Sequence, residues 1–255
     1  MIQFTFLGTC AADFSPRLTG DCKNRFDRDA RRASCALING RFLLDCGPHC
    51  PDSLRIAGID PGGITDIILT HLHDDHFNVK SVEYVASRHP VRLYVRADAV
   101  LPHMENVTVV RMNCYEKYTL DENVFVTGLP ANHDARSCPQ HLLIEAEGKK
   151  IFYGMDGGWL LNGTYAALWH KNLDLCVLDG TCGDYTGDFR MGEHNSIPMI
   201  RLMLPSFRTV GIIDSHTLVY ISHLAPSLHK PHEETVRICE KDGIRTAFDG
   251  LTLSL

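Results

Sequence analysis

The sequence predicts an α/β fold of layered type (α+β layered), a β-sheet sandwich with helices on the outside. Short apolar strands dominate the first half of the 255-residue chain, and strands alternate with helices in the second half. That order of elements is typical of sheets packed in layers beneath outer helices. Because 44% of the residues are hydrophobic and 22% are charged, we expect one domain over residues 1–255.

The first half of the chain is expected to consist mainly of strands. Residues 2–7 alternate in polarity as a strand does, and residues 34–45 predict a hairpin whose turn is Asn39-Gly40. Residues 13–32 are charged and have no hydrophobic period, which predicts a long loop of the kind that often serves function. The remaining expected elements are helices at 50–57, 81–88 and 97–103, and strands at 67–70, 91–95, 107–110 and 124–129.

The second half is expected to alternate strands with helices. Residues 141–145 and 150–153 predict a hairpin around Glu147-Gly148. Strands are then expected at 173–178 and 218–221, and helices at 164–170, 197–204 and 233–242, while residues 251–255 end the chain.

The overall charge and composition exclude several classes of protein. A net charge of −6 and an isoelectric point near 6.1 disfavour a nucleic-acid partner. No apolar stretch is long enough to span a membrane, and the N-terminus lacks the features of a signal peptide, so we expect a cytoplasmic protein. The ten cysteines contain no Cys-x-x-Cys pair, so we expect buried thiols. A metal clip at Cys46, His49 and Cys50 and a homodimer both stay open.

One motif, His71-Leu72-His73-Asp74-Asp75-His76, directly follows the apolar strand at 67–70. His71 and His73 lie two positions apart, so an extended chain points both imidazoles to the same side. Asp75 and His76 follow the bend and approach from a second direction. Four nitrogen and oxygen ligands within six residues suit one or two divalent ions, with imidazole favouring Zn, Fe or Mn.

Three further polar residues follow apolar strands much later in the chain. His133 follows the strand at 124–129, Asp156 follows residues 151–155, and His223 follows residues 218–222. Each of them is a candidate ligand, and their shared position after a strand favours a common site.

This ordered set resembles the signature of the metallo-β-lactamase-fold metallohydrolases. The resemblance implies a four-layer αββα sandwich with two divalent metal ions, Zn or Mn, while Fe stays open. It implies that His71, His73 and His133 hold one ion. It also implies that Asp75, His76 and His223 hold the second ion, and that Asp156 bridges the two.

Within that family the chain is most similar to the bacterial phosphoribosyl 1,2-cyclic phosphate phosphodiesterases. The similar segments are Leu7-Gly8-Thr9, residues 34–45, the histidine motif, residues 129–133, Asp156, Asp179, His194, residues 221–223 and residues 248–250. Those enzymes bind a structural zinc through loop cysteines. This chain keeps only Cys10 and Cys22 in that region, so we expect no third metal.

The resemblance implies hydrolysis of a small or cyclic phosphodiester by a metal-bridging hydroxide. Asp75 and His194 are the expected catalytic residues, with His194 as the general acid and Glu193 as its alternative. We expect three carboxylates, Asp45, Asp179 and Asp249, to fix the imidazole ligands. Arg17 or Arg25 is expected to hold a second phosphate of a small-molecule substrate.

Three other functions stay open at this stage. A tRNA 3′-end endoribonuclease shares the order of ligands, but the chain is acidic and lacks a Lys-rich arm. A carboxylic ester, lactone or thioester hydrolase of the same fold is the second alternative. The third is a metal-binding module without turnover.

Overall fold

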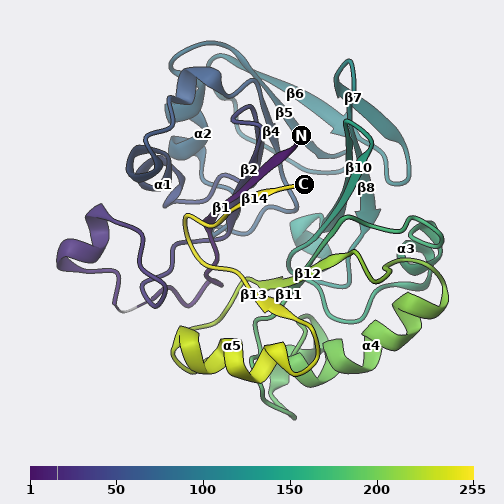
Figure 1. The fold of residues 1–255 in the computed structure, drawn as a ribbon. Helices are drawn as coiled ribbons and strands as arrows, with labels where there is room; N and C mark the ends of the chain where they lie inside the picture. The colour runs from purple at the N-terminus through teal and green to yellow at the C-terminus, as the bar shows by residue number, and fades with distance from the viewer. Residues whose placement is uncertain (16) are drawn as a thin grey trace.

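The structure, a computed structural model, describes residues 1–15 and 17–255, and it contains two seven-stranded sheets packed face to face (Figure 1). The first sheet has the order β14 (Thr252–Ser254), β1 (Gln3–Gly8), β2 (Cys35–Ile38), β3 (Phe42–Leu44), β4 (Asp66–Ile68), β5 (Val91–Arg96) and β6 (Val107–Met112). The second has the order β13 (Arg245–Thr246), β12 (Leu218–Ser222), β11 (Leu175–Asp179), β10 (Lys149–Gly154), β9 (Gln140–Ala146), β8 (Val124–Pro130) and β7 (Lys117–Asp121).

Three apolar cores hold these layers together. The central core lies between the two sheets and includes Phe4, Phe6 and Tyr153. A second core packs α1 (Cys50–Ala57) and α2 (Val79–Ala86) against the first sheet. The third packs α4 (Ile197–Thr209) and α5 (His232–Glu240) against the second sheet, next to the end of α3 (Asn162–Ala167). The order of layers is therefore helix, sheet, sheet, helix, which confirms the expected αββα sandwich.

Local sequence signals explain several of these elements. The predicted hairpin turn is present, because Asn39 and Gly40 both have the positive φ that a type I′ turn requires, 51° and 68°. Helix α1 ends at Gly58, whose φ of 67° no branched residue adopts easily. Ser196 caps α4 by accepting a hydrogen bond from the amide of Met199.

The helix predicted at 97–103 is wrong. These residues form a turn and a loop between the parallel strands β5 and β6. Pro102 disfavours helical geometry at the preceding residue, and the carbonyl of Ala99 accepts a hydrogen bond from the Arg111 guanidinium instead of from a helix amide.

Three edge strands and four short helical turns were not predicted. Strand β7 has a single buried residue, β13 has two residues and β14 has three, so none of them carries a clear apolar pattern. The 3-10 turns are η1 (Gly20–Asn24), η2 (Pro61–Gly63), η3 (Ala135–Ser137) and η4 (Phe189–Gly192). None of the helices in the described part of the chain is long and apolar enough to cross a membrane.

Parallel pairing determines where polar residues can collect. Strands β3 and β4 are parallel in the first sheet, and β10, β11 and β12 are parallel in the second. Parallel strands end at the same edge of their sheet, so the residues that follow them lie near one another. The histidine motif follows β4, Asp156 follows β10, and His223 follows β12.

Candidate metal centre

The structure brings all seven predicted ligands together at this edge of the two sheets. Asp45, Asp156 and His223 stand just past strands with positive φ values of 61°, 44° and 57°. This left-handed backbone is costly for residues other than glycine, and it clusters at functional sites. The sharp reversal after each strand turns the side chain toward the neighbouring strand ends.

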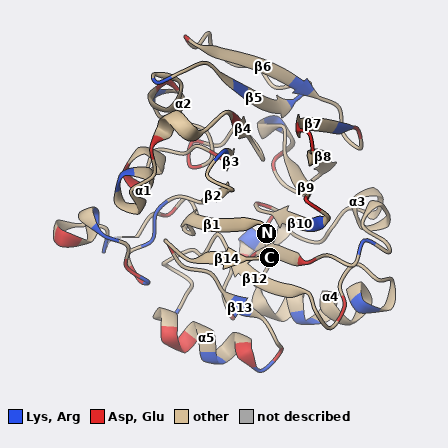
Figure 2. Ribbon diagram, turned by 45° about the horizontal axis from the view of Figure 1, so that its top comes forward, with Lys and Arg blue, Asp and Glu red and all other residues tan. Residues whose placement is uncertain are grey.

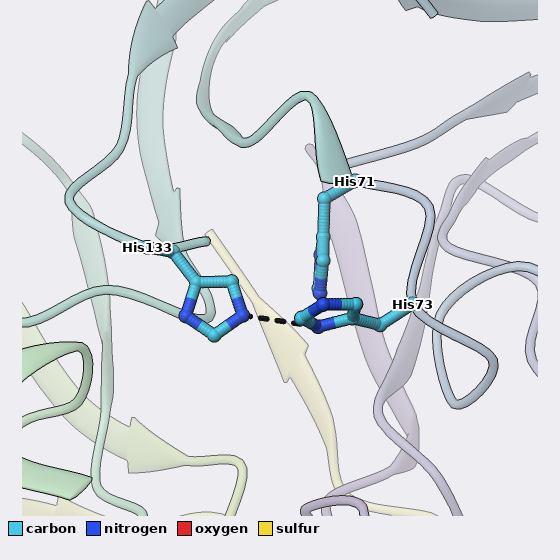
Figure 3. Close-up of side chains that lie close together, drawn as sticks. All are labelled: His71, His73 and His133. Carbon is cyan, nitrogen blue, oxygen red and sulfur yellow. Dashed lines mark hydrogen bonds between the residues drawn. The ribbon is translucent and has the colours of Figure 1, made fainter. Parts of the chain in front are cut away.

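His71, His73 and His133 form the first group of ligand atoms (Figure 3). His133 Nε2 lies 3.0 Å from His73 Nδ1, and the His71 ring stands edge-on to both other rings. His71 Nε2 is buried and has no hydrogen-bond partner. Three imidazoles that face one another without a shared acceptor are suited to one cation.

Asp75, His76, Asp156 and His223 form the second group, and all four are buried. Asp156 Oδ2 lies 2.7 Å from His76 Nε2 and 3.0 Å from His223 Nε2. Asp75 Oδ2 lies 3.3 Å from each of the same two nitrogens. Two carboxylates and two imidazoles therefore converge within the reach of one ion.

Asp156 faces both groups with different oxygens. Its Oδ2 belongs to the second group, while its Oδ1 lies 3.6 Å from His133 Nε2 in the first group. A carboxylate that offers one oxygen to each group can bridge two cations.

Three of the imidazoles are held by a polar group on the nitrogen that points away from the cluster. His76 Nδ1 lies 2.8 Å from Asp45 Oδ2, His71 Nδ1 lies 3.0 Å from the Thr70 hydroxyl, and His223 Nδ1 lies 2.7 Å from the Thr181 hydroxyl. A hydrogen bond at one ring nitrogen fixes the tautomer and leaves the other nitrogen free to ligate.

The surroundings of the second group of ligands favour positive charge. Burial opposes protonation of His76 and His223, but the carboxylate of Asp156 and its neighbours more than offset it, so the pKa of both imidazoles is raised, for His223 to about 10. Although burial acts in the opposite direction, the same histidines lower the pKa of Asp75 and Asp156.

Buried polar atoms without a hydrogen bond also indicate that this group favours a cation. His76 Nε2 and Asp156 Oδ2 are buried without a hydrogen bond, although they lie only 2.7 Å apart. When the neutral ring donates from Nδ1 to Asp45, its Nε2 lone pair faces an oxygen lone pair, so a proton or a metal ion has to lie between these two atoms. A cation between the two atoms removes that conflict, so the residues present fit a divalent metal.

His194 lies beside the ligands, ahead of α4 as expected. Its Nδ1 is 2.7 Å from Asp179 Oδ2, and its ring stacks on His223 at 5.6 Å between centroids. Burial lowers the pKa of His194, but the Asp179 carboxylate outweighs this effect and leaves it raised. Asp179 lies 3.6 Å from His223 Nδ1, so its main partner is His194 and not a predicted ligand.

The expectation that Asp249 fixes an imidazole ligand is wrong. Its carboxylate accepts hydrogen bonds from the Thr9 hydroxyl and the Arg32 amide, and it pairs with the Arg32 guanidinium at 3.8 Å. Asp249 therefore stabilises the junction of the long loop and the C-terminal segment. Asp45 takes the expected role at His76.

A cavity of about 280 Å³ opens over the candidate ligands. Besides five of the ligands it is lined by His194, Glu193, Arg190, Asp13 and Thr181. Neither Arg17 nor Arg25 lines it, and Arg190 supplies the guanidinium instead. Thr181, Thr70 and Arg190 were not among the site residues predicted from sequence. Thr70 and Thr181 lie near strand ends and close in sequence to the predicted residues His71 and Asp179. That position is the sequence feature from which they could have been predicted.

Comparison with known proteins identifies a family and several similar folds. Residues 28–152 match the Metallo-beta-lactamase superfamily. A ribonuclease Z from Methanothermobacter thermautotrophicus is 36% identical over 101 residues, which cover 37% of this chain and 29% of that protein. The match thus spans less than a third of the length of this curated relative.

Several solved structures share the fold over the whole chain. A diphosphatase from the PhnP family has a TM-score of 0.74 at 20% identity, covering 99% of this chain and 96% of the other. The Zn²⁺-bound PqqB from Methylobacterium extorquens has a TM-score of 0.72 at 18% identity, covering 99% and 100%. The short form of human tRNase Z has a TM-score of 0.67 at 20% identity, covering 99% and 98%.

Proposed function

Because the chain is a member of the metallo-β-lactamase superfamily, we propose that it is a dinuclear phosphodiesterase that hydrolyses a small or cyclic phosphodiester. The main support for this proposal is the position of Asp156, whose two carboxylate oxygens face the two different ligand groups. His194, which is hydrogen-bonded to the Asp179 carboxylate, lies beside these groups. Two groups of ligands that share a carboxylate suit the displacement of an oxygen at phosphorus, where charge develops on both sides.

Each ligand group has an assigned role. His71, His73 and His133 would hold one ion, Asp75, His76 and His223 would hold the other, and Asp156 would bridge them. When bound, Zn or Mn supplies Lewis acidity that makes water a nucleophile near neutral pH and offsets charge on the phosphoryl oxygens. Thr70, Asp45 and Thr181 keep the imidazoles oriented throughout the reaction.

His194 is the group that protonates the departing oxygen. Its Nδ1 is held by Asp179, so Nε2 is the ring nitrogen left to give up a proton. The Asp179 carboxylate stabilises the imidazolium form that a general acid requires. Glu193 lies 3.7 Å from His133 Nδ1 and borders the same cavity, which makes it the alternative acid.

The names of two similar proteins support cleavage of a phosphorus–oxygen bond. The similar structure is described as a diphosphatase, and the curated relative is a ribonuclease Z. Carboxylic ester, lactone and thioester hydrolysis remain alternatives within this fold.

The proposal is tested by hydrolysis of bis-p-nitrophenyl phosphate after chelation and addition of Mn or Zn. We expect metal-dependent turnover that falls at least about a hundredfold in His73→Ala, because one ligand of the first group is lost. The exposed His216→Ala is the matched control and should keep full turnover. Turnover without metal, undiminished turnover in His73→Ala, or faster hydrolysis of p-nitrophenyl carboxylic esters would refute the assignment.

The similarity to ribonuclease Z makes tRNA 3′-end processing the second candidate. The net charge of −6 counts against it, because RNA binding relies on cationic side chains. Cleavage of a precursor tRNA by the metal-loaded protein, with a gel shift at physiological salt, would favour this function over a small substrate.

A further inference from the structure

A second cavity, of about 210 Å³, lies between the long loop and the segment that follows β12. We call it the cationic cavity. Its polar lining consists of Ser15, Arg17, Asp29, Arg31, His229 and Lys230. The long loop is rich in Lys and Arg (Figure 2), and two of its arginines reach this cavity.

Arg31 is the most deeply held of these cations, with a relative exposure of 6%. Its guanidinium donates to the Thr9 hydroxyl at 2.6 Å and to the Ala247 carbonyl at 2.7 Å, and it lies 2.9 Å from His232 Nδ1. All three partners are neutral acceptors. Arg31 makes no direct ion pair among the described residues, but the Thr9 hydroxyl that it contacts donates to the Asp249 carboxylate at 2.8 Å, so this carboxylate lies one hydroxyl away.

The charge of the cavity is opposite to that of the chain. Arg17, Arg31 and Lys230 face it with a single carboxylate, Asp29, which lies 3.5 Å from Arg17. His229 donates from Nε2 to the Gly180 carbonyl at 2.7 Å, and burial lowers its pKa to about 4, so it adds no charge. A local excess of cations in a chain of net charge −6 needs an explanation.

The two cavities are neighbours along the same two segments of chain. Residues 11–13 and Ala225 line the metal cavity, while Ser15, Leu224 and Pro226 line the cationic cavity. The Asp13 carboxylate accepts a hydrogen bond from the amide of Ser227 at 3.3 Å and joins the two segments. A ligand in the cationic cavity therefore lies next to the wall of the metal cavity.

We propose that the cationic cavity binds a phosphate monoester group at a site separate from the metal centre. The Arg17 guanidinium and the Lys230 ammonium offer donors that a phosphate dianion takes. Arg31 adds the N–H groups that it does not donate to its three internal partners, and it is buried enough for its charge to be weakly screened by solvent. The phosphate can belong to the substrate itself or to a free molecule. The site stands on its own geometry, and only its part in substrate binding rests on the proposed function.

Calorimetric titration of the metal-loaded protein with inorganic phosphate tests the site directly. The double variant Arg17→Gln/Lys230→Gln removes two exposed cations and leaves the buried Arg31 in place. It should weaken phosphate binding about tenfold or more. Lys23→Gln, an exposed cation of the same loop, is the control and should bind like the wild type.

His73→Ala separates this site from phosphate bound at the metal ions. We expect it to keep the binding event that the double variant loses. If phosphate fails to bind the wild type at millimolar concentration, binds the double variant equally well, or is lost only in His73→Ala, the cationic cavity is not a phosphate site.

Paired substrates identify the source of the phosphate. Adenosine 2′,3′-cyclic phosphate is compared with the same nucleotide carrying a 5′-phosphate. A preference in kcat/KM for the phosphorylated nucleotide that falls about tenfold in the double variant assigns the cavity to the substrate. Phosphate binding without that preference assigns it to a free phosphorylated molecule. If neither nucleotide is hydrolysed, the proposed function fails while the binding result still decides the cavity.

Discussion

The metal centre and the cationic cavity border the same chain segments but are built in different ways. The ligands of the metal centre follow β4, β8, β10 and β12, and three of their imidazoles form hydrogen bonds with Asp45, Thr70 and Thr181. The cations of the second cavity come from a long loop and from the segment after β12. Rigid strand ends suit chemistry that needs fixed geometry, whereas loops can change recognition without changing the fold.

The sign of the charge separates the two regions as clearly as their construction. The metal cavity is lined by Asp13, Asp75, Asp156 and Glu193 with one guanidinium, Arg190. The cationic cavity has three basic side chains and one carboxylate. If this contrast is functional, substitutions at strand ends should remove metal and turnover, and substitutions in the loop should change only what is bound.

Asp156→Asn should have the largest effect. The variant keeps the shape of the side chain but removes the charge shared by both ligand groups, so we expect turnover to fall by about a thousandfold or more. Mass spectrometry of the metal content should show fewer ions per chain than in the wild type. Full metal content with normal turnover would show that Asp156 does not bridge.

His194→Gln should have the next largest effect, and the effect should depend on the leaving group. We expect an alkyl phosphodiester to lose about a hundredfold in kcat, because its leaving oxygen needs a proton. Bis-p-nitrophenyl phosphate should lose much less, because p-nitrophenolate is a stable anion. Steady-state kinetics with both substrates measures this, and equal losses would argue against a general acid.

Asp45→Asn should weaken metal binding by about 10- to 100-fold, because His76 loses the carboxylate that fixes its ring. The matched control is Asp249→Asn, another buried carboxylate after an apolar segment, which pairs with Arg32 and contacts no ligand. Competition with a chelator measures both affinities. Equal weakening in the two variants would remove the distinction that the structure draws between these carboxylates.

The smallest expected effect concerns His232, which holds Arg31 of the cationic cavity. Burial, followed by the charges of Arg31 and Arg28, lowers the pKa of His232 to about 4. A lowered histidine pKa contributes stability above the unfolded value of about 6.5, and this stability is lost as the pH falls from 6.5 through 4. His232→Asn should remove that dependence.

Denaturant unfolding at several pH values measures this contribution. We expect wild type and His232→Asn to differ by about 1–3 kcal/mol more at pH 7 than at pH 4. The exposed His216→Asn is the control. A difference independent of pH would mean that His232 is not held neutral by its surroundings.

The layered fold and the site residues could be predicted from sequence because their signals are local. A histidine or an aspartate that directly follows an apolar stretch marks the end of a strand. The order of these residues along the chain led to the seven candidate ligands. The helix boundaries at α1 and the turn at Asn39-Gly40 are also local, since Pro51 and Gly58 delimit the helix and glycine favours the turn.

Other features depend on contacts that no local pattern contains. Asp249 and Asp45 both follow apolar residues, yet Asp249 pairs with Arg32 of the long loop and Asp45 contacts His76. Strand β7 is polar and is stabilised by pairing with β8, so its sequence does not distinguish it from a loop. The cationic cavity joins residues about 200 positions apart, such as Arg31 and Lys230.

The central claim is that Asp156 and six other side chains hold two cations, and the metal content of the intact protein tests it most directly. Native mass spectrometry after loading with Zn or Mn should give two ions per chain for the wild type and at most one for Asp156→Asn. A wild type that holds no ion under these conditions, or a variant that still holds two, would contradict the account.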